Sequence, residues 1–274
     1  MTVDIPVMGW PRQVRVIPES NEEPLRHLLI GGSGIVGTVL SRSLVQMGHR
    51  VAVIDPREPD VKGVEWHCGD AKTADLIAAQ VSEADIVAFL ATGANQGWAG
   101  IQATEIEGLV AVLESCLGSK TVRRLIFASS NHAAGGYELD RLDYRISHSI
   151  SPISPNRPDG LYGAAKCFGE ALCRTVGELY NFPTSVLRIG TMRLNDDPLA
   201  HTDDPDFAKY GGPQVREQRL LGSWLYHKDL VEIYRREVMS RQTFRLCFAS
   251  SNAGSIWSDE VMTWSPSAEG GTHD

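Results

Sequence analysis

The segment LRHLLIGGSGIVG, residues 25–37, decides the fold. It is a short apolar run followed directly by glycines at positions 31, 34 and 37, and the apolar residues after it recur at helical spacing as far as Met47. This order predicts a strand, a tight turn and a helix, with Gly48 as the C-terminal cap of the helix. Glycine lets the chain turn sharply and lets a phosphate approach the backbone at the helix N-terminus. The segment therefore indicates a dinucleotide site, although glycine turns also join many strands to helices without binding a nucleotide.

The same alternation of short apolar runs and helical periods continues along the chain. We expect further strands at 50–54, 64–68, 85–90 and 124–128, and helices over 101–117 and 161–180. Strands that alternate with helices predict a parallel sheet covered on both faces. The predicted fold class is α/β, a Rossmann-like doubly wound parallel sheet with a small C-terminal substrate-binding region.

The chain divides into three expected parts. Residues 1–24 form an N-terminal arm, residues 25–190 the dinucleotide-binding core with its catalytic helix, and residues 191–274 the substrate-binding region. The segment 194–218 is rich in Asp, Pro and Gly and predicts an inserted surface loop.

Composition excludes several classes of protein. A net charge of −8 argues against nucleic acid, which is bound by clustered Lys and Arg. No apolar run is long enough to cross a membrane, and the N-terminal sequence lacks the features of a secretory signal. Five cysteines at irregular spacing, without a CxxC pair, predict free thiols, and no histidine or carboxylate spacing predicts a metal site. These features favour a cytoplasmic protein.

Asp55 distinguishes between the two nicotinamide dinucleotides. It ends the second expected strand, 18 residues after Gly37. A carboxylate there accepts hydrogen bonds from an adenosine ribose and repels a 2′-phosphate, so NAD is favoured over NADP. Arg57 argues in the opposite direction, for NADP, because its side chain could reach a phosphate. Asp70, after the third strand, either faces the adenine or is a solvated turn residue.

Tyr162 and Lys166 are the candidate catalytic pair. They lie four residues apart on an expected helix, so their side chains share one face. A tyrosine has a reference pKa of about 10, and an adjacent ammonium favours its phenolate form. Ser130, after the strand ending FASS, could hold the substrate oxygen against the phenol. Taken alone, each residue has an ordinary structural explanation: an exposed helix pair, and a strand-end serine bonded to backbone.

Together these motifs resemble the extended short-chain dehydrogenases/reductases, the NAD-dependent epimerase/dehydratase family. The stretches FASSNH (127–132), RPDGLYGAAKCFGE (157–170), LRIG (187–190) and RLLGSW (219–224) are similar to the uronate dehydrogenases. That resemblance implies an enzyme that uses NAD to oxidise the anomeric carbon of a hexuronic acid, with a small acidic sugar as partner. It also implies a homodimer, by analogy.

The resemblance assigns roles to individual residues. Tyr162 would be the general base, Lys166 would orient the nicotinamide ribose, and Ser130 would bind the reacting hydroxyl. The catalytic residues are thus Ser130, Tyr162 and Lys166. The expected substrate-binding residues are Ser130, Asn131, His132, Tyr162, Thr191 and Arg219, the last as partner of a carboxylate. The expected cofactor-binding residues are Gly31, Ser33, Gly34, Ile35, Val36, Gly37, Asp55, Asp70, Leu90, Ala91, Thr92, Tyr162 and Lys166.

The chain departs from the family pattern in the pocket. Glu105 stands where an asparagine is expected, Ala94 and Ala165 where serines are expected, and the 194–218 insertion lies beside the substrate. Two other functions stay open: an epimerase or dehydratase in which NAD is reduced only transiently, and a non-catalytic dinucleotide-binding sensor. Ser130-Asn131 offers no Asp-Glu pair for a dehydratase.

Overall fold

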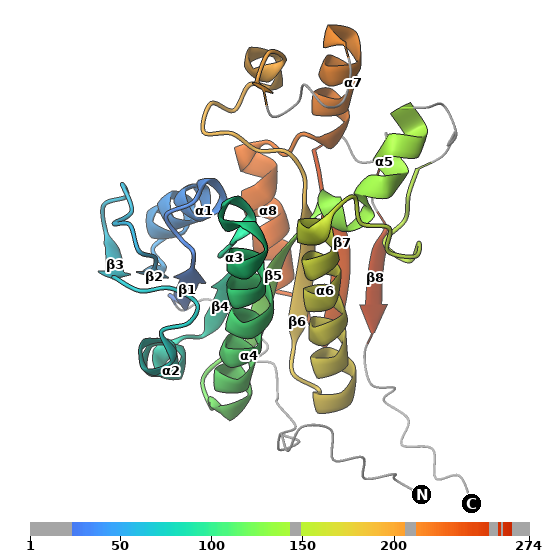
Figure 1. Cartoon of the computed structure of the whole chain (residues 1–274). Coiled ribbons are helices and arrows are strands. Elements are labelled where there is room, and N and C mark those ends of the chain that lie inside the picture. Colours follow the sequence, from blue (N-terminus) through green and yellow to red (C-terminus); the bar gives the residue numbers. More distant parts are fainter. Residues whose placement is uncertain (1–23, 143–148, 206–211, 252–256, 259, 265–274) are drawn as a thin grey trace, which may run out of the picture.

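A single twisted sheet organises the chain (Figure 1). The structure is a computed structural model, and it describes residues 24–142, 149–205, 212–251, 257–258 and 260–264. The N-terminal arm expected over 1–24 lies outside the described residues, apart from Pro24. None of the described helices combines the length and apolar character needed to cross a membrane.

The sheet has eight strands in the order β3-β2-β1-β4-β5-β6-β7-β8. Every neighbouring pair is parallel except β7 and β8, which are antiparallel. The strands are β1 Arg26–Ile30, β2 Arg50–Ile54, β3 Val64–His67, β4 Ile86–Phe89, β5 Arg124–Ser130, β6 Thr184–Ile189, β7 Phe244–Ala249 and β8 Val261–Trp264. The predicted Rossmann-like, mostly parallel α/β fold is confirmed.

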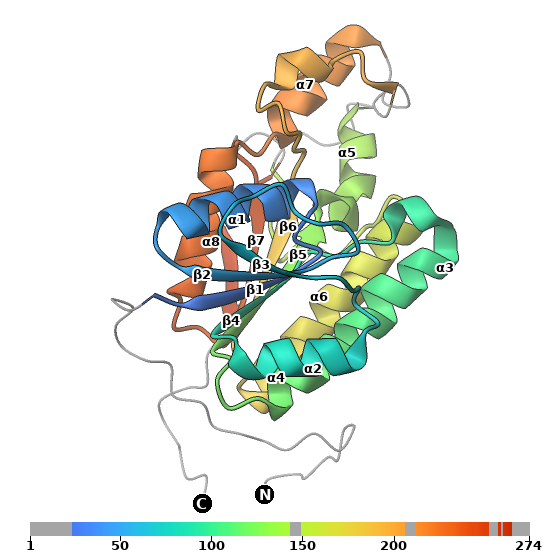
Figure 2. The same cartoon turned by 90° about the vertical axis from the view of Figure 1, so that its left-hand side faces the viewer.

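Helices cover both faces of the sheet, which explains the continuous apolar runs of the central strands. α1 and α8 lie on one face, and α2, α4 and α6 on the other (Figures 1 and 2). The bounds of the helices are α1 Ile35–Gln46, α2 Ala74–Glu83, η1 Ala94–Gln96, α3 Gly97–Ile101, η2 Gln102–Gly108, α4 Leu109–Gly118, η3 Asn131–Ala134, α5 Gly135–Leu142, α6 Leu161–Tyr180, η4 Pro198–His201, α7 Pro213–Ser223 and α8 His227–Val238.

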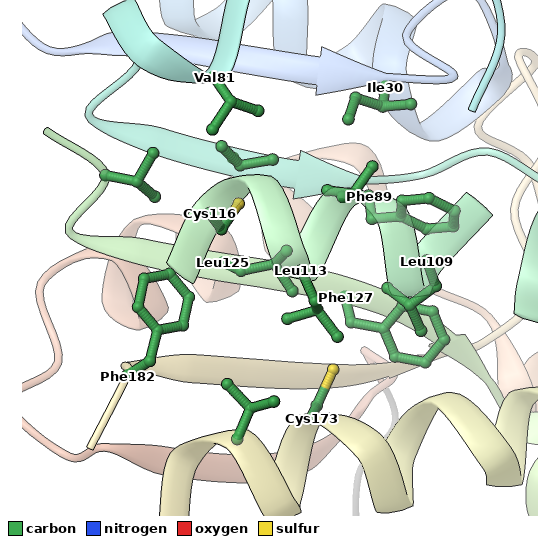
Figure 3. Packing of buried hydrophobic residues seen from close by; sticks show 14 of the residues in the cluster. Ile30, Val81, Phe89, Leu109, Leu113, Cys116, Leu125, Phe127, Cys173 and Phe182 are labelled. Carbon is green, nitrogen blue, oxygen red and sulfur yellow. The ribbon is translucent and has the colours of Figure 1, made fainter. Parts of the chain in front are cut away.

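The larger core fills the space between the central strands and α4 and α6. Phe89 and Phe127 contact each other there, with Leu113 and Cys173 from the covering helices close by, all fully buried (Figure 3). Burying a side chain of this size contributes about 1.5–3 kcal/mol, so the helices are held to the sheet mainly by apolar contact.

Strand order places the future site at one edge of the sheet. β1 pairs with β2 on one side and with β4 on the other, so that Ile30 lies opposite both Ile54 and Phe89. The loops after these three strands therefore meet at the carboxyl edge. This is the topological switch point, where open α/β sheets bind their ligands.

The segment above this edge is more helical than its composition predicts. The surface loop expected over 194–218 contains η4 and the first residues of α7, so that expectation was wrong in part (Figure 1). Pro198 and Pro213 each open a helix, a position where the missing N–H costs nothing. Proline indicates a loop or a helix start equally well, and here it marks the start of two helices.

A buried histidine near the start of β1, away from the carboxyl edge of the sheet, makes the stability of the protein depend on pH. His27 is 1% exposed, and its Nδ1 lies 2.9 Å from the hydroxyl of Tyr234. Burial, with a smaller contribution from His49, lowers the pKa of His27 from 6.5 to about 3. Below pH 6.5 the unfolded chain takes up a proton that the folded chain refuses, so stability falls as the pH drops.

We predict that His27 makes the free energy of unfolding about 2 kcal/mol smaller at pH 5 than at pH 7.5. In His27→Gln this contribution disappears, and the difference between the two pH values shrinks by that amount. Urea denaturation of both proteins at the two pH values measures it. An equal pH difference in both proteins would contradict the prediction.

Candidate active site

The first of two adjoining cavities lies over the switch point. It has a volume of about 350 Å³ and is lined by residues from the ends of β1, β2, β3 and β4. Seven of the residues expected to bind the cofactor line it: Gly31, Gly34, Asp55, Asp70, Leu90, Ala91 and Thr92. Ser33 lies beside it through a hydrogen bond to Asp55, and Gly37 packs against Gly32 at the start of α1.

Gly31 shows why the turn after β1 needs glycine. Its φ is +84°, and a Cβ atom there would lie 2.4 Å from the amide nitrogen of Ala91. The backbones after β1 and β4 are thus in direct contact, which keeps the floor of the cavity free of side chains. α1 begins beside it with no side-chain cap at Gly34, so backbone N–H groups at its N-terminus lie at the cavity. The cavity fits the adenosine and diphosphate part of a dinucleotide.

Asp55 is held in place by backbone donors. Its Oδ2 accepts the N–H of Ser33 at 3.1 Å, and its Oδ1 accepts the N–H of Arg57 at 2.9 Å. The carboxylate is buried, whereas the Arg57 side chain is 76% exposed. A fixed negative charge at the end of β2 suits a ribose diol and disfavours a 2′-phosphate.

The second cavity, of about 600 Å³, adjoins the first at Thr92, which lines both. Its walls come from the ends of β4, β5 and β6 and from the start of α6. All six residues expected to bind substrate line it: Ser130, Asn131, His132, Tyr162, Thr191 and Arg219. Ile35 and Val36, expected at the cofactor, also line it. The fold therefore brings the six substrate residues together although they are separated by up to 89 positions in the sequence.

Lys166 lies behind this cavity and is only 2% exposed. Its Nζ donates to the carbonyl oxygen of Ala128 at 2.9 Å and lies 5.4 Å from the centre of the Tyr162 ring. Close packing of α6 fixes this arrangement, because a Cβ at Gly163 would lie 2.2 Å from the carbonyl oxygen of His132. The predicted pair is therefore adjacent, with the ammonium beneath the phenol.

A chain of hydrogen bonds links Ser130 to Arg219. The Ser130 hydroxyl donates to Asn131 Oδ1 at 3.2 Å, and Asn131 Nδ2 donates to Glu138 Oε1 at 2.8 Å. Glu138 Oε2 accepts from Arg219 Nε at 2.7 Å, and both members of this ion pair are buried. Glu138 was not predicted. It lies on α5, six residues after the FASSNH stretch, and none of the stretches that carry the family resemblance includes it.

Two further polar contacts at the cavity were also missed. His132 Nδ1 lies 2.7 Å from Asp159 Oδ2, and the imidazole meets the Tyr162 ring edge-on at 5.7 Å. Arg193, after β6, donates to Asp204 at 3.1 Å. Asp159 lies in the RPDGLYGAAK stretch, three residues before Tyr162. This closeness in the sequence is the signal that could have indicated a place in the site.

The described residues hold no group of three or more His, Cys, Asp or Glu arranged for a metal ion. Asp204, one of the aspartates in the acidic stretch after His201, pairs with Arg193. His201 stacks on Trp224, and His227 Nε2 hydrogen-bonds to the Arg193 carbonyl. His148 and Asp206 lie outside the described residues.

Comparison with known proteins identifies the family. The pattern of the NAD dependent epimerase/dehydratase family matches residues 27–195, more than half of the chain. The protein belongs to this family. The predicted family is thereby confirmed, and with it NAD as cofactor, which the cavity at the switch point fits.

Two curated relatives of this family member cover most of the chain. Uronate dehydrogenase of Agrobacterium fabrum is 28% identical over 251 residues, which is 88% of this chain and 84% of that protein. L-arabinose 1-dehydrogenase (NAD(P)(+)) of Haloferax volcanii is 28% identical and covers 78% of this chain and 82% of its own.

The fold of this family member is shared with solved structures. The crystal structure of uronate dehydrogenase from Agrobacterium tumefaciens superposes with a TM-score of 0.66 at 24% identity, over 86% of this chain and 80% of that one. Glucuronic acid dehydrogenase from Chromohalobacter salexigens gives the same TM-score at 22% identity, with the same shares of the two chains.

We predict that Asp55→Ser lowers the preference for NAD over NADP by about tenfold or more. The change removes the charge that repels a 2′-phosphate, and Arg57 then stands beside the ribose. Dissociation constants for both dinucleotides, from fluorescence titration of the reduced forms, measure the ratio. Asp70→Asn is the matched control, and an unchanged ratio in Asp55→Ser would contradict the prediction.

Glu138 and Arg219 are predicted to be energetically coupled. Breaking a buried ion pair by removing one partner costs about 3–5 kcal/mol, whereas removing both costs less than the sum. We expect a coupling free energy above about 1 kcal/mol in the cycle of Glu138→Gln, Arg219→Gln and the double variant. Urea denaturation measures it, and additive losses would show that the pair is not coupled.

Proposed function

We propose that this protein is an NAD-dependent dehydrogenase that oxidises a hydroxyl of a small carboxylate-bearing sugar. A hexuronic acid, oxidised at its anomeric carbon, is the substrate class favoured. One observation carries the proposal: Ser130, Tyr162 and Arg219 line a single cavity that adjoins the dinucleotide cavity at Thr92.

The chain's own residues supply the acid–base chemistry. The Tyr162 phenol oxygen takes the proton of the substrate hydroxyl, and the Lys166 ammonium lies 5.4 Å from the centre of its ring. Ser130 holds the same hydroxyl oxygen at the end of β5. NAD, which the glycine turn and Asp55 would hold, would accept the hydride from the carbon that bears this hydroxyl. The product is a carbonyl, a lactone when the anomeric carbon reacts.

Arg219 supports a substrate with a carboxylate. Glu138 accepts a hydrogen bond from the Nε of Arg219, which fixes the plane of the guanidinium. A planar guanidinium binds a carboxylate with two parallel hydrogen bonds. Arg193, on the wall of the same cavity, adds a second cation, part of whose charge is offset by its ion pair with Asp204.

Net oxidation is favoured over the alternatives weighed from the sequence. The residues beside Ser130 are Asn131 and His132, not the acidic pair that a dehydratase would use. Ser130 and Tyr162 on the wall of one cavity, with Lys166 buried behind it, disfavour a non-catalytic sensor. We further propose a cytoplasmic homodimer. None of the five cysteines, all of which lie in the described residues, forms a disulfide, and α6 exposes the apolar side chains of Leu161, Phe168 and Leu179.

The test is NADH formation with a panel of uronic acids, the matching neutral aldoses, and hydroxy acids. We expect the uronic acids to be oxidised, and Tyr162→Phe to lower kcat/KM by about 10²–10⁴-fold, because the phenol transfers the proton. Arg219→Gln should raise KM for uronic acids but not for neutral aldoses, since only the former present a carboxylate.

Oxidation of neutral aldoses alone would disprove the carboxylate assignment. Full activity in Tyr162→Phe would disprove the mechanism. Cofactor that stays bound during purification and never releases NADH would indicate an epimerase-type reaction instead.

A further inference from the structure

Glu105 is a fully buried carboxylate that the chemistry above does not use. It lies on η2, a π-helical turn between α3 and α4, and its exposed fraction is 0%. Taking a carboxylate out of water costs several kcal/mol unless the protein replaces the lost hydration. Its contacts therefore show what holds it there.

All hydrogen bonds at the Glu105 carboxylate are donated to it. Thr92 Oγ1 donates to Oε1 at 2.7 Å, and the N–H of Gly93 lies 3.2 Å from Oε1 and 3.0 Å from Oε2. The Thr92 hydroxyl itself accepts the N–H of Ala94 at 3.2 Å, which directs its own proton to Glu105. An ionised carboxylate, which only accepts, suits these two donors.

The same carboxylate faces the catalytic lysine. Lys166 Nζ lies 3.9 Å from Glu105 Oε1, and both groups are buried, so the interaction is poorly screened by solvent. Lys166 in turn lies under the Tyr162 ring, and Thr92 lines both cavities. Glu105 thus connects the floor of the cofactor cavity to the ammonium beneath the catalytic phenol.

Other charged or titratable groups around η2 have different roles. On α6, Glu170 pairs with Arg188, and burial raises the pKa of the Cys173 thiol. On α4, Glu114 is exposed and Cys116 is a buried thiol; α3 and η1 contain no titratable side chain, and Glu107 on η2 itself is exposed. Among the described residues, Lys166 is the cation paired with Glu105.

We propose that Glu105 is a positioning residue: its carboxylate fixes the Thr92–Gly93 turn and Lys166, and offsets the charge of that ammonium beneath the nicotinamide end of the site. The inference rests on the proposed function for its kinetic consequence only. A negative charge here favours the oxidised, positively charged cofactor over the reduced one, and it weakens the effect of Lys166 on the phenol.

Glu105→Gln tests the proposal, because it removes the charge and keeps the size. The ratio of dissociation constants for NAD and NADH should rise roughly three- to tenfold, and the acid limb of kcat/KM should move to lower pH by roughly 0.5–1.5 pH units. NADH fluorescence titration with NAD competition gives the ratio without any substrate. That measurement therefore stands even if the proposed sugar substrate is wrong.

Glu107→Gln is the matched control: it removes the same charge from the exposed side of the same turn, and it should change neither value. Glu105→Asp, which retains the charge, should keep the ratio within about twofold of the native protein. Should Glu105→Gln fail to fold, Glu105→Asn replaces it, with the same expectations. An unchanged ratio in a folded neutral variant, or a ratio that Glu105→Asp alters as strongly, would overturn the proposal.

Discussion

A buried ammonium is the constraint on which the site depends. Lys166 is 2% exposed, and an ion of this kind costs several kcal/mol to remove from water. The Lys166 ammonium is stabilised by the Ala128 carbonyl oxygen, 2.9 Å from its Nζ, and by the Glu105 carboxylate at 3.9 Å. Its Nζ also lies over the rings of Phe127 and Tyr162. These partners come from β5, η2 and α6, so holding one charge ties these three segments into a single arrangement.

On the substrate side of the site, too, a buried charge is held by partners from other segments. Arg219 is buried with Glu138, and Asn131 links that carboxylate to Ser130. The group favoured for the sugar carboxylate and the serine favoured for the reacting hydroxyl are thus parts of one hydrogen-bonded chain. Because α5 and α7 lie above the carboxyl edge of the sheet, their packing decides where this arginine stands (Figures 1 and 2).

Local pattern was sufficient for the core of the fold. The strands beginning at Arg26, Arg50 and Arg124 and the helix from Leu161 were predicted within one or two residues, because continuous apolar runs and helical spacing are strong local signals. The region after Gly190 was predicted poorly. Its helices η4 and α7 are short and weakly amphipathic, and their prolines favour a loop as readily as a helix start.

The sequence by itself determined the Rossmann-like sheet, the glycine turn, the carboxylate at the end of β2 and the Tyr162–Lys166 pair, because each depends on neighbours within a few positions. Only the tertiary structure decided what those residues contact. Glu138 meets Arg219 across 81 positions and Glu105 meets Lys166 across 61, and no local spacing encodes such pairs. Buried charges must find opposite charges wherever the fold places them, and that choice is made by packing rather than by sequence order.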